Sequence, residues 1–534
     1  MTATAARRQA AMLAVVTVAL AGCAAGAEET DVAAGTTIVL ADPQPLGEYN
    51  PVGGYGELGV SPLYDGLLRP QAVSDEQLPA LVPGLAAAQP SSNDDSTVWD
   101  VPLRSDVHFS DGTSLTADDV VATYEAVLDP ASASGIAASY AMIDAVTAVD
   151  DHHVRFELAH PYAAFPALLL LGIAPAEHLT GGPALDSPLN RQPVGTGPYV
   201  LTDLTAEQAV LEANPDYWAG APEVTRLVVV HMPDDNARAQ RMRAGDIDGT
   251  VLPPALARSF ENDDGATVHA VQSADWRGVS LPADNPLTAD ERVRLAMNLG
   301  VDRQSMITDV LAGHGRPAHS PAAAVYGDGF DPAATFDHDP DRARALLEDA
   351  GWLPEADGVR VHDGARAELT VLYPAPDTVR RDLATAFAAD MAELGIDVTL
   401  AGSSWDEMDR RVADSAILLG GGDRPYDLDT QMYGALHGRA ASTATYDNPA
   451  GFQIPGVDDA LDDARRTLDP VHRAQQYRAV QRAYVEHPTH VFLAFLDHTY
   501  VSVDDGWDTG PLVMEPHAHG VTWGPWWNLA AWHR

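Results

Sequence analysis

Polar and aromatic side chains gather in a short segment that follows three consecutive glycines. They combine a carboxylate, two guanidinium groups, a phenol and an imidazole, and they are Arg424, Tyr426, Asp427, His437 and Arg439. A carboxylate placed there can pair with a ligand ammonium, and a guanidinium can pair with a ligand carboxylate. An imidazole can coordinate a metal ion. We therefore predict a ligand-binding segment, in which His437 is either a ligand or metal contact or a surface histidine after a helix.

A second group of polar side chains lies near the carboxyl end. His517 and His519 are one residue apart and follow Glu515. In an extended chain two such imidazoles point to the same side, and this spacing occurs among metal ligands. The same segment holds a cluster of tryptophans, Trp523, Trp526, Trp527 and Trp532. Aromatic core packing is therefore the preferred interpretation, and a metal site at His517 and His519 is the weaker one.

Two aromatic residues outside these groups are further candidates. Tyr55 lies on a glycine-rich loop whose flexible backbone could form a cleft wall, although an ordinary surface loop fits equally well. Trp276 lies where we expect the chain to cross between lobes, and it could stack on a ligand. We predict both as ligand contacts.

The sequence lacks the common catalytic motifs. It contains no G-x-S-x-G, no H-E-x-x-H and no P-loop. Carboxylates are too numerous for a paired-carboxylate site to be excluded by sequence. We expect a protein that is not an enzyme and needs no cofactor, with a secreted hydrolase or a surface sensor as less favoured alternatives.

Several regular elements can be predicted from the sequence, beginning with residues Thr97–Asp129. Alternating apolar residues predict two short strands, at 99–103 and 107–109. Thr116 then has the position of a helix cap with Asp119 in the reciprocal place. Further along, Thr288 is expected to cap a helix, and residues 369–400 predict a strand, a helix and a second, parallel strand.

The complete string from Trp99 to Tyr124 resembles the signature segment of the extracytoplasmic solute-binding proteins of ABC importers, the oligopeptide, dipeptide and nickel group. Three further segments resemble landmarks of this family in the same order: residues 193–199, 234–248 and 292–303. The resemblance implies an α/β, two-lobed periplasmic-binding-protein-like fold of type II, in the large "cluster C" form with an inserted extra subdomain.

The same resemblance implies a function and partners. We expect a monomer that captures a small peptide and delivers it to ABC permease subunits with their ATPases. In peptide binders a carboxylate of the 420–438 segment pairs with the ligand's amino terminus, and Asp427 is predicted for this role. Pro425-Tyr426-Asp427 also resembles the nickel binders, with His437 near their metal-contacting histidine, so a metal chelate is the alternative ligand.

The resemblance also implies an order of domains. A length of 534 residues agrees with more than one domain. We expect a signal peptide, a tether, a first lobe, a second lobe and a return to the first lobe at residues 1–22, 23–35, 36–280, 281–492 and 493–534. The extra subdomain is expected at about residues 63–192.

The amino terminus resembles the leader of bacterial lipoproteins. Arg7 and Arg8 precede an apolar run too short to span a bilayer as a stable helix, and Leu20-Ala21-Gly22-Cys23 completes a lipobox. This implies cleavage before Cys23 and a lipid on its sulfur. We expect a protein anchored to the outer face of the cytoplasmic membrane, at the cell surface or in the periplasm, with an ordinary secretory signal as the alternative.

The charge restricts the partners further. The chain holds 32 Lys and Arg against 77 Asp and Glu, a formal net charge of −45. Binding to phosphate backbones needs the opposite sign. Nucleic acid is therefore excluded as a partner, and contact with the membrane is expected through the lipid anchor only.

Overall fold

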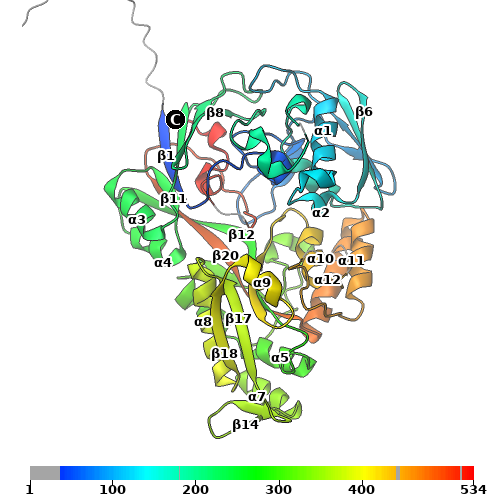
Figure 1. The fold of residues 1–534 in the computed structure, drawn as a ribbon, viewed down its shortest axis with the longest axis vertical. Coiled ribbons are helices and arrows are strands. Elements are labelled where there is room, and N and C mark those ends of the chain that lie inside the picture. The colour runs from blue at the N-terminus through cyan, green and yellow to red at the C-terminus, as the bar shows by residue number, and fades with distance from the viewer. Residues whose placement is uncertain (1–35, 180, 440–444, 518–519) are drawn as a thin grey trace, which may run out of the picture. The chain divides into compact units, whose positions relative to one another are not determined.

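The computed structural model describes residues 36–179, 181–439, 445–517 and 520–534 (Figure 1). The predicted leader, the tether with Cys23, and His519 lie outside the described residues. No helix within the described ranges is long and apolar enough to cross a membrane. Residues 281–492 are called the second lobe below, and the other described residues the first lobe, after the predicted boundaries.

One mixed sheet organises most of the described chain. Its strands follow the order β18-β17-β19-β12-β20-β11-β1-β10-β9-β8, with β13 beside β20. Pairing is parallel for β1 with β10 and β11 and for β17 with β18 and β19. The strands are β1 (Thr37–Asp42), β8 (Tyr199–Leu204), β9 (Gln208–Ala213), β10 (Arg226–His231), β11 (Gly249–Val251), β12 (Ala266–Ser280), β13 (Gly315–Pro317), β17 (Glu368–Pro374), β18 (Asp397–Ser403), β19 (Ala416–Gly421) and β20 (His490–Val503).

Two long antiparallel strands, β12 and β20, join the two parts of this sheet (Figure 1). They have 15 and 14 residues, and β19 flanks β12 while β11 flanks β20. Register shifts between Gln272 and Trp276 and between Arg277 and Gly278 bulge the pairing. In a regular strand, side chains alternate between the two faces with a period of two. A bulge changes which side chains share a face, so the pattern does not continue through it.

The second lobe contains the predicted parallel strand pair. β17 pairs in parallel with β18, and α8 (Thr378–Glu393) connects them. Leu383, Phe387 and Met391 project from α8 into a buried cluster that includes Val371 of β17 and Leu418 of β19. Burying each such side chain contributes about 1.5–3 kcal/mol to the free energy of unfolding, so α8 is held on the sheet mainly by its apolar face.

The signature segment forms a separate four-stranded sheet covered by one helix. The order is β4 (Ser91–Ser92), β5 (Val98–Pro102), β7 (His153–Leu158) and β6 (Ile143–Asp150), and α1 (Ala117–Leu128) packs on it. The predicted cap of α1 is confirmed, because the Thr116 amide donates to the Asp119 carboxylate at 2.8 Å. The predicted strand at 107–109 is wrong. Only an isolated bridge of His108 to Ser114 forms there, because the turn leaves no neighbouring strand to pair with.

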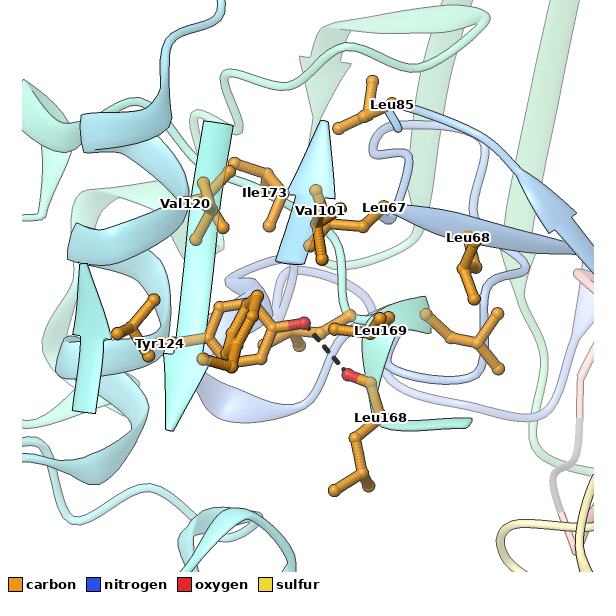
Figure 2. Packing of buried hydrophobic residues seen from close by; sticks show 14 of the residues in the cluster. Leu67, Leu68, Leu85, Val101, Val120, Tyr124, Leu168, Leu169 and Ile173 are labelled. Carbon is orange, nitrogen blue, oxygen red and sulfur yellow. Dashed lines mark hydrogen bonds between the residues drawn. The ribbon is translucent and has the colours of Figure 1, made fainter. Parts of the chain in front are cut away.

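The buried core of this subdomain lies between α1 and the chain around residue 168 (Figure 2). Tyr124 of α1 is fully buried, and its hydroxyl donates to the Leu168 carbonyl oxygen at 3.0 Å. Val101, Val120 and Ile173 fill the space beside it. A buried hydroxyl without such a partner would cost free energy, so this bond holds α1 against the short 3₁₀ helix Phe165–Leu170.

The remaining elements surround these sheets. The short strands are β2 (Leu68–Gln71), β3 (Ala80–Pro83), β14 (Leu353–Pro354), β15 (Arg360–His362) and β16 (Ala365–Arg366). The other helices are α2 (Ala137–Tyr140), α3 (Asp235–Ala244), α4 (Pro254–Ala257), α5 (Glu291–Gly300), α6 (Arg303–Ser305), α7 (Pro340–Asp349), α9 (Trp405–Arg411), α10 (Leu428–Leu436), α11 (Val457–Arg466) and α12 (Pro470–Glu486).

Candidate ligand-binding site

A cavity of about 880 Å³ lies against the first lobe. Its wall comes from the end of β1, the glycine-rich loop that carries Tyr55, and the C-terminal segment that carries His517 and three tryptophans. Asp423 of the second lobe completes it. Cavities of this size hold small-molecule ligands.

Asp423 is the carboxylate that the structure presents to this cavity from the second lobe. Its side chain is 72% exposed, and the His517 imidazole nitrogen Nδ1 lies 3.9 Å from it. Within the described residues no donor lies within hydrogen-bonding distance of its carboxylate. The surrounding cavity wall partly desolvates the Asp423 carboxylate although its surface is exposed, and together with the negative charge of Asp275 this raises the pKa of Asp423 to about 6. A raised pKa means that the ionised form of this carboxyl group is disfavoured, and a positively charged ligand would favour that ionised form.

Glycines set the position of Asp423. β19 ends at Gly421, where a Cβ would lie 2.3 Å from the Trp276 ring. Gly422 has a φ of +104°, and a Cβ there would lie 2.2 Å from the Ala274 carbonyl oxygen. Only glycine fits so close an approach in this conformation, so the chain turns tightly against β12 and delivers Asp423 to the cavity.

Arg424, predicted to meet a ligand carboxylate, instead connects the two lobes. Its guanidinium lies 2.6 Å from the Glu57 carboxylate of the glycine-rich loop and also donates to the Ser139 hydroxyl. It lies 5.7 Å from the centre of the Tyr140 ring. Both members of the ion pair are largely shielded, with side chains 16% and 20% exposed. The predicted contact of Arg424 with a ligand stays a prediction. The sequence did not indicate its contact with the other lobe.

Asp427, predicted to pair with a ligand ammonium, has partners inside the second lobe. It caps α10 by accepting the Asp429 amide at 2.8 Å, and both of its oxygens pair with Arg473 at 2.6 and 2.9 Å. Tyr426 is packed against the core of the signature-segment subdomain, and its hydroxyl has no hydrogen-bond partner among the described residues. Neither residue lines the cavity as described.

His437 and Arg439 lie beyond α10. The His437 ring stacks on Tyr433 at 4.3 Å, and its Nδ1 lies 2.8 Å from the Gly438 carbonyl oxygen. Arg439 donates to the Asp447 carbonyl oxygen at 2.7 Å. The predicted metal role of His437 is not tested by these contacts. Across the described ranges, no group of three or more His, Cys, Asp or Glu side chains is arranged to hold a metal ion.

Trp276, predicted to stack on a ligand, is buried against side chains of the second lobe. Its ring packs edge-on against Phe492 at 4.9 Å, and it is 6% exposed. Tyr55 and His517 are the predicted residues that do line the cavity as far as it is described. The stacking role of Trp276 stays a prediction.

Behind His517 lies a buried charged network at the β12–β20 crossing. His498 lies between the Glu515 carboxylate at 2.6 Å and the Asp275 carboxylate at 3.0 Å, and Asp275 also pairs with Arg277. Burial disfavours a charged imidazole, but the two carboxylates outweigh this and raise the pKa of His498 to about 9. The Tyr500 hydroxyl donates to Glu515 at 2.8 Å. Glu515, near which a metal site was considered, is thereby held by protein partners.

Sequence reasoning missed two residues that the structure brings to the cavity, Asp423 and Glu57. The three glycines before Asp423 were a usable signal, because they mark a close backbone approach and a turn. Glu57 carried no signal, since its partner Arg424 is 367 positions away.

Two lobes joined by long strands, with a ligand-sized cavity closed by one carboxylate of the second lobe, define a solute-binding protein of the periplasmic-binding type. A sequence model described as bacterial extracellular solute-binding proteins, family 5 Middle, matches residues 80–443. The chain belongs to this family. The predicted family and fold class are confirmed, and the protein is a transport binding protein and not an enzyme.

Individual relatives agree with this family. The chain is 40% identical over 472 residues to Protein XP55 of Streptomyces lividans, covering 88% of this chain and 84% of that protein. It is 29% identical over 448 residues to Di/tripeptide-binding protein 2 of Pseudomonas aeruginosa, covering 77% and 81%. NikZ from Campylobacter jejuni, solved in complex with Ni(L-His), matches with a TM-score of 0.81 at 27% identity and covers 93% of this chain and 99% of that one.

Proposed function

We propose that this protein captures small peptides outside the cytoplasm and delivers them, as a monomer, to the permease subunits of an ABC importer. The observation that carries the proposal is Asp423, a carboxylate that faces the cavity with a raised pKa and no hydrogen-bond donor among the described residues. A peptide ammonium would supply the missing positive charge. The name of the Pseudomonas relative, a di/tripeptide-binding protein, supports the same ligand class.

Asp423→Asn tests this proposal. A hydrogen bond to a charged group contributes about 1.5–3 kcal/mol, so we expect roughly a 10- to 100-fold loss of affinity for a free tripeptide. Calorimetry with Ala-Ala-Ala and with its N-acetylated form measures it, and acetylation should weaken wild-type binding similarly. Asp414→Asn is the matched control, because Asp414 lies in the same lobe with its side chain equally 72% exposed but outside the described cavity wall. Equal affinity of wild type and Asp423→Asn would refute the role of Asp423.

A metal chelate is the second candidate ligand. The likeness to a Ni(L-His) complex favours it, as does His517 in the cavity wall. If the ligand is a chelate, titration with Ni²⁺ and L-histidine should give binding that His517→Ala weakens, whereas Ala-Ala-Ala should not bind. Native mass spectrometry of the purified protein gives the mass of any co-purified ligand. That mass distinguishes a peptide from a metal chelate directly.

We also propose that Cys23 carries the lipid that holds the protein on the outer face of the cytoplasmic membrane. The proposal rests on the lipobox sequence Leu20-Ala21-Gly22-Cys23. Two acyl chains suffice for stable anchoring. Cys23→Ser should move the protein from the membrane fraction to the soluble fraction without changing its melting temperature. A variant that is processed and remains on membranes washed with high salt would contradict lipid anchoring at this residue.

A further inference from the structure

The cavity wall belongs almost entirely to the first lobe. Most of its lining residues come from the loop between Gln44 and Pro62, from residues 65–82, from strand residues such as Tyr199, Leu211 and Leu227, and from the C-terminal segment between Val521 and Ala531. Among the described lining residues, Asp423 is the one that comes from the second lobe. A ligand in this cavity therefore rests on the first lobe, and the second lobe adds a single carboxylate to it.

The C-terminal segment offers aromatic surface to this ligand. Trp523, Trp526 and Trp527 all line the cavity. Trp526 is fixed by edge-on packing against Tyr500 at 5.8 Å, and Trp527 by its indole nitrogen, which donates to the Pro511 carbonyl oxygen at 2.9 Å. Because these rings are already held in place, little conformational freedom is lost when a ligand packs on them.

The glycine-rich loop adds a second aromatic surface to the wall. Tyr49 and Tyr55 both line the cavity, and their rings meet edge-on at 5.1 Å. Tyr55 also meets Tyr64 at 6.2 Å, so the pair is supported from behind. Aromatic faces on the loop and on the C-terminal segment favour a bulky apolar group over a small polar one.

The ionisable groups of the wall are mostly acidic. The carboxylates are Asp42, Glu48, Glu57, Asp65 and Asp423, against one lining guanidinium, that of Arg69, among the described residues. Asp65 already accepts hydrogen bonds from Trp218 at 2.8 Å and Tyr217 at 3.1 Å. Negative side chains of a ligand would meet a like charge, which disfavours their burial here.

From this wall we infer the ligand class: short peptides that carry an aromatic or large aliphatic side chain and no acidic one, with that side chain packed on Trp527 and its neighbours in the C-terminal segment. The inference rests on the proposed function, because it specifies which peptides the same cavity selects. The charge of Asp423 sets the ammonium end, and the tryptophans set the side-chain preference.

Three tripeptides test the inference on the full-length protein: Ala-Phe-Ala, Ala-Ser-Ala and Ala-Glu-Ala, titrated by calorimetry. We expect Ala-Phe-Ala to bind at least about tenfold more tightly than Ala-Ser-Ala, from the apolar area that the phenyl ring buries, and Ala-Glu-Ala to bind most weakly. Trp527→Ala should abolish the preference for phenylalanine. Trp507→Ala is the control, because Trp507 is also a partly exposed tryptophan of the C-terminal region but does not line the described cavity.

Each outcome of this test has one meaning. Equal affinities for the three peptides on the wild type overturn the side-chain inference while leaving peptide capture intact. A phenylalanine preference that survives in Trp527→Ala also overturns it, provided that the variant melts cooperatively. If Trp527→Ala fails to fold, the wild-type ranking alone decides. If no tripeptide binds the wild type, by calorimetry or native mass spectrometry, peptide capture itself is wrong.

Discussion

At the scale of single residues, the structure separates two neighbouring acids of similar appearance. Asp427 is held by Arg473 and by the first turn of α10, whereas Asp423 faces the cavity. A carboxylate already paired with a guanidinium gains little from a ligand ammonium, while one that faces a cavity without a hydrogen-bonded cation among the described residues can form a new ion pair with it. Asp423 is therefore the acid on which ligand recognition is expected to depend.

The raised pKa of Asp423 predicts how peptide affinity changes with pH. Its pKa of about 6 applies to the form without ligand, and a bound ammonium lowers it by favouring the ionised carboxylate. Binding then releases a proton below pH 6, so affinity should be greatest near pH 7 and fall as pH drops through 6, by up to about tenfold per pH unit. Calorimetry between pH 5 and 7 measures this, a range in which the peptide's own α-ammonium, with a pKa of about 7.7–8.0, stays mostly protonated.

Asp423→Asn removes the titrating group and gives the control for the pH series. Its residual affinity for the same tripeptide should be flat over this range. A wild-type profile without slope, or the same slope in the variant, would show that another group governs the pH dependence.

At the scale of elements, the segment between β19 and α10 is held to the glycine-rich loop by the Arg424–Glu57 pair. The two residues belong to different lobes, and both are mostly shielded from solvent. Exclusion of water strengthens the attraction between the two charges of an ion pair. When only one partner is removed, the other charge stays shielded from water without a counter-charge, and this destabilises the protein. This pair is therefore suited to stabilise the arrangement in which Asp423 reaches the cavity.

A double-mutant cycle on Arg424→Gln and Glu57→Gln measures this stabilisation. Each single variant should bind a tripeptide more weakly and release it faster, and the two changes should couple by roughly 0.5–3 kcal/mol. Stopped-flow dissociation and calorimetry supply the data. The Arg410–Glu407 pair has the same 2.6 Å separation but is exposed on α9, and its variants should leave affinity unchanged. Additive effects at Arg424 and Glu57 would mean that the pair does not act as a unit.

At the scale of the whole molecule, further contacts join the lobes besides this pair. The Ala163 amide donates to the Arg465 carbonyl oxygen at 3.0 Å, and the Arg465 guanidinium lies 5.2 Å from the Tyr162 ring. These contacts connect the signature-segment subdomain with α11. They describe an arrangement in which the lobes are already closed on each other, with β12 and β20 as the covalent connections between them.

Closure predicts a change in size on binding. In solution the ligand-free protein should sample more open forms, and a tightly bound peptide should reduce the radius of gyration measured by X-ray scattering. At a ligand concentration of 100 Kd the same peptide should add about 2.7 kcal/mol to the free energy of unfolding and raise Tm. A peptide that binds tightly but leaves the radius of gyration unchanged would argue against a hinged two-lobe mechanism.

Family membership and most local elements could be predicted from the sequence. Three such features depend on residues that lie close together in the chain, so the periodicity and spacing of the residues predict them. They are the cap of α1 by Thr116 and Asp119, the β17–α8–β18 unit and the apolar face of α8. Such a local prediction fails where a neighbouring residue can take the same capping position. Thr288 was expected to cap α5, but Asp290 takes that place and the Thr288 hydroxyl donates to Pro282 instead.

Which side chains remain available to a ligand depends on long-range packing, which the sequence does not reveal. Asp427 and Arg473 are 46 positions apart, and Arg424 and Glu57 are 367 apart. No local pattern encodes such pairings, because they depend on how separate elements pack. Among acids of one short segment, the fold therefore assigned Asp427 to the protein's own arginine and left Asp423 to the cavity, since a carboxylate's role is set by the charges and donors that packing brings to it.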